Sequence, residues 1–204
     1  MWGGQGLARL TTTVGDGFGW WTPWAELLEG GWPWLLLLPA GIGWAWSHRQ
    51  EKAARWQLVL LLGSAVMVLP LRTQLPWYSH LLWPPIALLC AEGLHQLLEQ
   101  GRPRWVSQTW LVMGGVLTIV GCVVIVNQSS TIPGLSLVLA GLGIALGGWT
   151  LQAKTRQRRW QGLGILVIGW GFALIALWHS QLWLWELNES WDPRPVAAAI
   201  KTLP

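Results

Sequence analysis

Six apolar stretches separated by short polar segments form the dominant pattern of this chain. They cover residues 32–46, 56–71, 81–98, 109–126, 134–152 and 161–178. A helix that crosses a bilayer needs about 20 mainly apolar residues, and unbroken apolar runs favour helices over strands, in which apolar residues alternate. The pattern therefore predicts an all-α fold, a polytopic transmembrane helical bundle of about six spans.

The basic residues between these stretches predict the orientation of the bundle. Nine of them follow the first, third and fifth stretches: Arg49, Lys52, Arg55, Arg102, Arg104, Lys154, Arg156, Arg158 and Arg159. Four fall in the remaining segments: Arg9, Arg72, Arg194 and Lys201. Because short cytoplasmic loops are rich in Lys and Arg, both termini are expected to be extracytoplasmic. Residues 1–31 are then an N-terminal segment with an interfacial helix, residues 32–178 the bundle, and residues 179–204 an extracytoplasmic tail.

Composition narrows the class of protein. Of the 204 residues, 52% are hydrophobic and only 11% are charged, whereas ordinary soluble domains are about 25% charged. These values argue against a soluble enzyme, and the basic residues form no single patch that would indicate nucleic-acid binding. Many of the 20 tryptophans lie near predicted span ends, for example Trp56, Trp110 and Trp160. Indole rings at such positions anchor helices at the membrane surface.

Glycines recur in the last three stretches and predict how those stretches pack. They are Gly114, Gly115, Gly141, Gly143, Gly147, Gly148, Gly162, Gly164, Gly169 and Gly171. Small residues let membrane helices approach closely, so these three stretches are expected to contact one another. The same stretches carry no ionisable residue at mid-depth, which argues against a small transporter with an ion or proton pathway.

The segment between the second and third stretches gathers the residues with the clearest candidate chemistry. Arg72, Trp77, Tyr78 and His80 lie there, and Tyr78 is the only tyrosine of the chain. An arginine can hold phosphate oxygens through two parallel hydrogen bonds, while an aromatic face and a hydroxyl suit a sugar ring or a polyprenyl head group. The alternative is an ordinary interfacial loop in which Arg72 reaches lipid phosphates.

Two other groups of polar residues leave alternatives open. Glu92 and His95 share a helical face, where a functional pair competes with simple hydrogen bonding at the membrane interface. The basic cluster at residues 154–159 is foremost a cytoplasmic orientation signal, and a specific site for an anionic lipid is the alternative.

The stretch Arg72–Ala91 also resembles a known family. It is similar to a pattern, Ser/Arg-Thr-Lys-Leu-Pro-x-Tyr followed by spaced prolines and Ala-Leu-Leu, that occurs in membrane glycosyltransferases of the GT-C superfamily. The resemblance is to dolichyl-phosphate-mannose–protein mannosyltransferases and to the aminoarabinose transferases acting on lipid A. The segments Thr12–Asp16, Gly30–Pro39 and Asp192–Lys201 resemble further parts of these proteins in the same order. One position departs from the pattern, because Gln74 stands where the family has lysine.

This resemblance implies a function. Such enzymes move a sugar from a polyprenyl-phosphate donor to an acceptor on the extracytoplasmic side, using a carboxylate as general base and cationic stabilisation of the leaving lipid phosphate. Arg72, Trp77, Tyr78 and His80 would contact the donor. The family's catalytic carboxylate lies upstream of the matched region, so the chain is expected to be a C-terminal portion without it, and its tail the start of a truncated domain. No catalytic residue is therefore assigned.

The expected setting follows from the same resemblance. The partners are the lipid bilayer, a polyprenyl-phosphate sugar donor and a missing N-terminal half or partner subunit, with no nucleic acid, in a bacterial plasma (inner) membrane. No cofactor or metal ligand set is evident in the sequence, although the resemblance leaves room for a divalent metal in full-length relatives. The alternative function is a non-enzymatic membrane subunit or scaffold that packs against partner helices.

Overall fold

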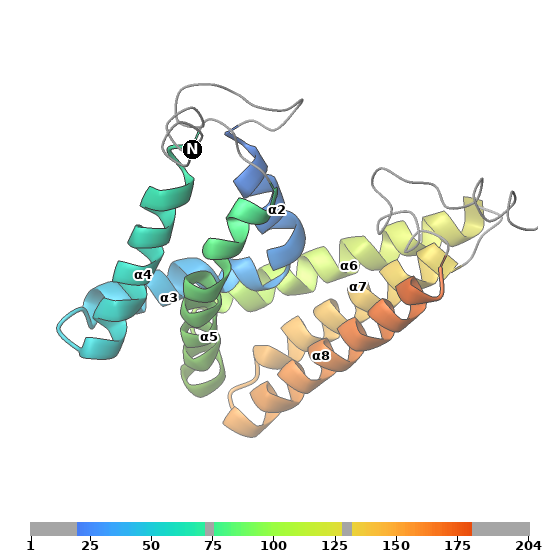
Figure 1. Ribbon diagram of the computed structural model, residues 1–204. Coiled ribbons are helices and arrows are strands. Elements are labelled where there is room, and N and C mark those ends of the chain that lie inside the picture. Colours follow the sequence, from blue (N-terminus) through green and yellow to red (C-terminus); the bar gives the residue numbers. More distant parts are fainter. Residues whose placement is uncertain (1–19, 72–75, 128–131, 181–204) are drawn as a thin grey trace, which may run out of the picture. The chain divides into compact units, whose positions relative to one another are not determined.

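The computed structural model describes residues 20–71, 76–127 and 132–180, and these residues form helices joined by short turns (Figure 1). The α-helices are α2 (Thr22–Gly31), α3 (Leu38–Ser47), α4 (Lys52–Val68), α5 (Trp83–Gln100), α6 (Arg104–Asn127), α7 (Ile132–Leu151) and α8 (Arg156–Trp178). Two 3-10 helices join them, η1 (Trp34–Leu37) and η2 (Pro76–Leu81). Over the described residues the all-α prediction is confirmed.

All six apolar stretches are helical, but they differ in length. The helices α6, α7 and α8 have 24, 20 and 23 residues and are apolar enough to cross a membrane. The first stretch is a four-residue 3-10 helix followed by the ten-residue α3, and α4 has 17 residues. The described part of the chain thus contains three helices that meet the length and composition of a membrane span, while the count of six and the side of the termini stay predictions.

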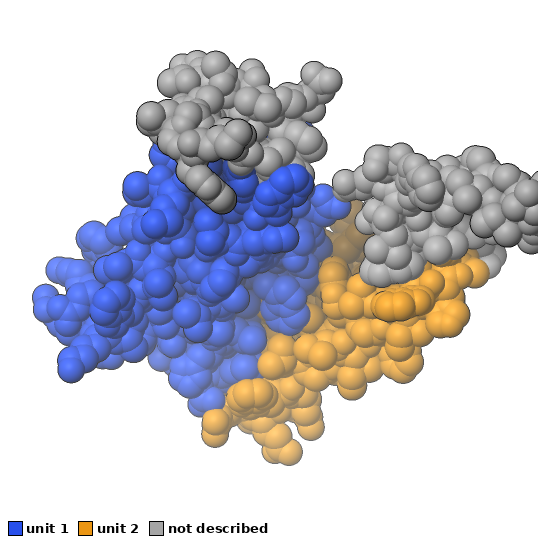
Figure 2. All heavy atoms as spheres, viewed as in Figure 1, with its two compact units in different colours: residues 1–103 blue, residues 104–204 orange. Residues whose placement is uncertain are grey.

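The chain divides into two compact units, unit 1 (residues 1–103) and unit 2 (residues 104–204), which Figure 2 colours separately. The division falls at Pro103, inside the region that the apolar pattern treats as one bundle. Immediately before it, α5 ends at Gly101, whose φ of 68° is the left-handed conformation that glycine adopts easily. The Gly101 N–H donates to the Leu97 carbonyl, so the helix is closed by its own backbone.

In unit 1, two glycines bring α3 and the end of η1 against the backbone of α5. A Cβ atom added at Gly41 would overlap the backbone of Leu89, and one added at Gly93 would overlap the carbonyl of Leu37. Leu89 is also fully buried with Ala45 and Ala54, beneath partly buried neighbours from α3 and α4. Close backbone contact at two points therefore fixes α3 on α5, although neither glycine belongs to the glycine-rich later stretches.

In unit 2, glycines join α7 to both of its neighbours. A Cβ atom at Gly143 would lie 2.8 Å from the Cα atom of Gly169 in α8, and one at Gly148 would lie 2.7 Å from the Leu111 nitrogen in α6. Seven of the ten glycines named above make contacts of this kind: Gly114, Gly141, Gly143, Gly147, Gly148, Gly162 and Gly169. The remaining three face open space, so the predicted close packing is confirmed with those exceptions.

The exposure of the tryptophans agrees with interfacial positions at four sites and corrects the prediction at one. Trp56, Trp105, Trp149 and Trp160 are exposed near helix ends, as membrane-surface anchors would be. Trp110, in contrast, is fully buried, and its Cβ atom lies against Gly148 of α7. The prediction that Trp110 is an anchor is wrong because the small residue opposite leaves room for a complete indole inside the unit.

Candidate functional site

Three of the four predicted donor-binding residues lie together on η2. Trp77 and His80 are exposed and Tyr78 is half-buried. The rings of Trp77 and Tyr78 meet edge to face, with centroids 6.3 Å apart and planes at 86°, a favourable geometry for aromatic rings. The fourth residue, Arg72, lies outside the described residues, as does Gln74. The structure therefore presents an aromatic pair and an imidazole on one short helix, directly after the segment that contains Arg72.

The position of η2 is fixed by its neighbours. Ser79 is buried, and its carbonyl accepts a hydrogen bond from the Leu82 N–H at 2.8 Å. The helix contacts α2, α4 and α5. Proline at positions 84 and 85 then starts α5, where a missing backbone donor costs little. With Ser79 turned inward, the polar ends of Trp77 and His80 remain on the outside.

An apolar cavity of about 470 Å³ lies next to Leu82, the residue that follows η2. Its lining comes from α2, η1, α3, α4 and α5 and the residues at their ends: Trp24, Leu27, Leu28, Leu35, Leu38, Ile42, Leu61, Leu62, Ala65, Leu69, Leu82 and Ile86. Leu69 ends α4 just before the Arg72 segment, and Leu82 directly follows η2. Residues on both sides of the candidate loop therefore line this cavity, and we call the cavity the outer groove.

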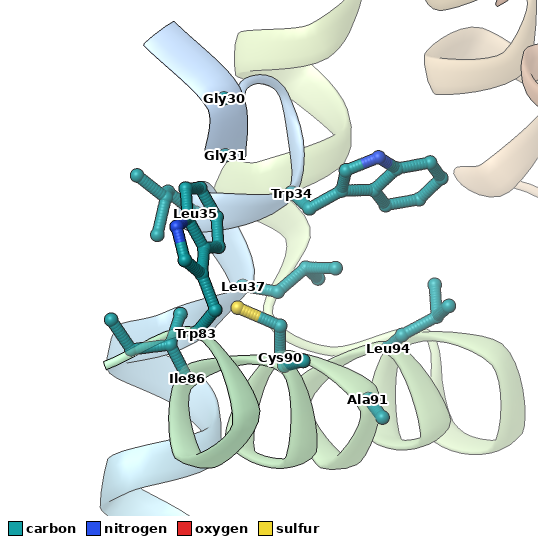
Figure 3. A pocket seen from close by; sticks show the side chains of 11 residues that line it. Gly30, Gly31, Trp34, Leu35, Leu37, Trp83, Ile86, Cys90, Ala91 and Leu94 are labelled. Atoms are coloured by element: carbon teal, nitrogen blue, oxygen red, sulfur yellow. The ribbon is translucent and has the colours of Figure 1, made fainter. Parts of the chain in front are cut away.

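A second apolar cavity, of about 260 Å³, shares Leu35 and Ile86 with the outer groove. Figure 3 shows Leu35 and Leu37 of η1 together with Trp83 and Cys90 of α5 in its lining. Both cavities fall within the size range of small-molecule sites, about 300–1,000 Å³, or just below it. Because their walls carry almost no polar surface, they suit hydrocarbon rather than a sugar.

Charge is distributed unevenly around the outer groove. The helix α2, which packs against η2, carries Glu26 and Glu29. Arg49, Lys52 and Arg55 lie at the far end of α4, and Arg102 lies beyond the far end of α5. Among the described residues, neither α2 nor η2 carries a lysine or an arginine.

The predicted pair of Glu92 and His95 lies within one helix. On α5, Glu92 is partly buried and His95 is exposed. In the described parts of the chain, no three His, Cys, Asp or Glu side chains gather as metal ligands would. The lining of the outer groove was the feature missed from the sequence, because apolar residues that line a cavity have the same pattern as those that face lipid.

Comparisons with known proteins support the resemblance given by the motifs. The chain is 31% identical to the undecaprenyl phosphate-alpha-4-amino-4-deoxy-L-arabinose arabinosyl transferase of Pectobacterium atrosepticum, over 70% of this chain and 27% of that protein. It is 33% identical to transferase 1 of the same name in Pseudomonas fluorescens, over 43% of this chain and 15% of that protein. No family model matches the chain, and no solved structure matches it.

These similarities support one branch of the predicted family resemblance. The chain resembles aminoarabinose transferases, a GT-C family, and the match covers about a quarter or less of the length of the relatives. The predicted resemblance is therefore confirmed for that branch. The likeness to mannosyltransferases and the activity of this chain stay predictions.

Proposed function

We propose that this chain is a portion of an integral membrane glycosyltransferase that takes a sugar from a polyprenyl-phosphate donor on the extracytoplasmic side. The observation that carries the proposal is that Leu69 and Leu82, on the two sides of the candidate loop, both line the outer groove. The isoprenoid chain occupies the groove, and Arg72 pairs with the lipid phosphate. Trp77, Tyr78 and His80 surround the sugar and its link to the phosphate.

The character of the groove supports this assignment of roles. Ile42, Leu61 and Leu69 are typical of its wholly aliphatic and aromatic lining, which suits the methyl-branched hydrocarbon of an isoprenoid chain. The exposed polar tips on η2 suit the part of the donor that must meet an acceptor. The general base belongs to a part of the enzyme outside this chain, as the resemblance implies, so this chain's role is to bind and orient the donor.

The distribution of basic residues supports the orientation. Arg49, Lys52 and Arg55 lie at the end of α4 opposite the candidate loop, and Arg102 lies beyond the opposite end of α5. Under the positive-inside rule those ends face the cytoplasm and the loop faces outward. We extend this to six spans with both termini outside, a bundle over residues 32–178 flanked by outer segments 1–31 and 179–204, in the inner membrane of a bacterium.

Donor binding can be measured on the chain itself. The full chain is reconstituted in nanodiscs and titrated with radiolabelled undecaprenyl phosphate. Arg72→Ala is expected to weaken binding about tenfold, because it removes a charge-assisted bidentate contact. Arg102→Ala removes the same charge at the other end of α5 and serves as the matched control, with an expected change below about twofold. Equal affinity of the Arg72→Ala variant and the unmodified chain would contradict the proposal.

The second candidate function is a scaffold, and one observation favours it. Gly115, Gly164 and Gly171 face open space on α6 and α8, where a partner helix could approach closely. A scaffold needs no lipid donor, so a chain that binds undecaprenyl phosphate no better than a neutral lipid would favour this alternative.

A further inference from the structure

The lysine and arginine residues that the structure describes in unit 2 gather at one end. Residues 104–180 contain five basic residues and no aspartate or glutamate: Arg104, Lys154, Arg156, Arg158 and Arg159. Gly148 near the end of α7 contacts the beginning of α6, and Leu151 contacts Gly162 near the beginning of α8. All five basic residues therefore lie at the same end of the three helices, with no acidic side chain among the described residues of the unit to neutralise them.

A polar cavity of about 370 Å³ opens at this basic end, where α7 meets α8. It is lined by Trp149, Thr150, Gln152, Ala153, Arg158 and Gln161. Arg158 supplies a planar set of N–H donors and the Gln161 amide supplies two more, while Nε2 of Gln152 donates one hydrogen bond to the Gly148 carbonyl at 3.4 Å and keeps a second N–H. Unlike the apolar cavities of unit 1, this cavity combines positive charge with hydrogen-bond donors, which is the chemistry that a phosphate oxygen requires.

The turn that carries the cavity is held by a different arginine. Arg159 is buried, and its Nη1 donates to the carbonyl oxygens of Ala153 and Lys154 at 3.1 and 3.0 Å. These bonds satisfy carbonyl groups just beyond the end of α7 and fix the path of the chain into α8. Arg158 is exposed and is left to face solvent or a ligand. Arg159 therefore stabilises the turn, whereas Arg158 is available to bind a ligand.

Apolar side chains continue from the cavity along both helices. On α7, the exposed residues Leu142, Leu146 and Trp149 recur at helical spacing. On α8, Ile165 and Ile168 follow Gln161 on one face. Lipid acyl chains can pack along such rows, and the exposed indole of Trp149 can lie beside the glycerol backbone of the lipid.

We propose that this cavity is a binding site for an anionic phospholipid of the leaflet in which the basic end lies. The guanidinium of Arg158 pairs with the phosphodiester, Gln152 and Gln161 donate to the head group, and the acyl chains follow the apolar rows. This site shares no residue with the outer groove of unit 1 and does not depend on the proposed transfer reaction.

Native mass spectrometry of the detergent-solubilised full chain tests the site, with phosphatidylglycerol and phosphatidylcholine as competing probes. The unmodified chain should retain phosphatidylglycerol preferentially, and Arg158→Gln should lower its association constant about fivefold. Arg158→Lys keeps the charge and should retain most of the preference. Arg104→Gln removes an equal charge at the same end but outside the cavity, and should change binding less than about twofold.

Two results would overturn the proposal. One is an equal loss for Arg158→Gln and Arg104→Gln, since that would mean that total charge and not the cavity attracts the lipid. The other is displacement of phosphatidylglycerol by an equal concentration of glycerol phosphate, which would mean that a soluble phosphate is the ligand. Unchanged thermal midpoints of both variants would show that the difference is one of binding, because both side chains are exposed.

Discussion

Units 1 and 2 are both helical and apolar, yet they use helix packing in opposite ways. In unit 2 three long helices lie close together through glycines, such as Gly143 against Gly169, and the polar cavity described above opens at their basic end. In unit 1 the helices are shorter and interrupted by η1 and η2, and apolar cavities remain between them. Apolar cavities thus lie between the shorter, interrupted helices of unit 1, whereas the cavity described in unit 2 lies where α7 meets α8 at the basic end.

The largest expected effect concerns the tryptophan buried in unit 2. Trp110→Ala should lower the free energy of unfolding by about 3–5 kcal/mol, because it opens a cavity where a whole indole is enclosed. Trp105→Ala, one and a half turns earlier on α6 and exposed, should cost less than about 1 kcal/mol. Thermal unfolding followed by far-UV circular dichroism in detergent compares the two variants. Equal losses would mean that Trp110 does not hold α6 on α7.

The next effect concerns the glycine contact between α7 and α8. Gly143→Leu places a side chain where even a Cβ atom would lie 2.8 Å from the Gly169 backbone, so the helices must separate at a cost of about 2–3 kcal/mol. Gly164→Leu on α8 is the control, since nothing lies within 4 Å of its Cβ position, and its stability should change by less than about 0.5 kcal/mol. If both variants melt with the unmodified chain, the close packing of unit 2 is refuted.

A smaller effect tests whether the outer groove of unit 1 holds lipid. Ala65→Phe fills part of the groove from α4 and should weaken undecaprenyl phosphate binding about tenfold, a cost of about 1.4 kcal/mol. Val66→Phe adds a larger side chain to the same helix on an exposed face and should leave binding unchanged. A nanodisc titration of both variants measures the difference. Equal binding by both variants would mean that the donor does not bind in the outer groove.

The helices could be predicted from the sequence because the length and apolarity of each stretch indicate a helix. The glycine contacts of unit 2 could be anticipated because Gly141 and Gly143 sit in unbroken apolar helices, where small residues have few other roles. The contacts of Gly41 and Gly93 could not be anticipated, because each depends on the backbone of another helix that passes close to the glycine. The burial of Trp110 likewise depends on Gly148 opposite it.

The candidate site was predictable only in its polar part. Trp77, Tyr78 and His80 stood out by residue type, and η2 brings them together. Leu69 and Leu82 gave no signal, because a leucine that lines a groove and a leucine that faces lipid have the same periodicity. Their shared position in the groove lining depends on how α4 and α5 meet, and that is a tertiary property.

Photocrosslinking tests the central claim, that unit 1 binds the donor, most directly. The full chain in nanodiscs is irradiated with undecaprenyl phosphate that carries a photoreactive group in its isoprenoid chain, and the modified peptides are identified by mass spectrometry. Adducts are expected on the groove-lining parts of α4 and α5, near Ala65 and Ile86, and they should disappear when unlabelled undecaprenyl phosphate is in excess. Adducts spread over the exposed faces of α6 and α8, and insensitive to that competitor, would contradict the claim.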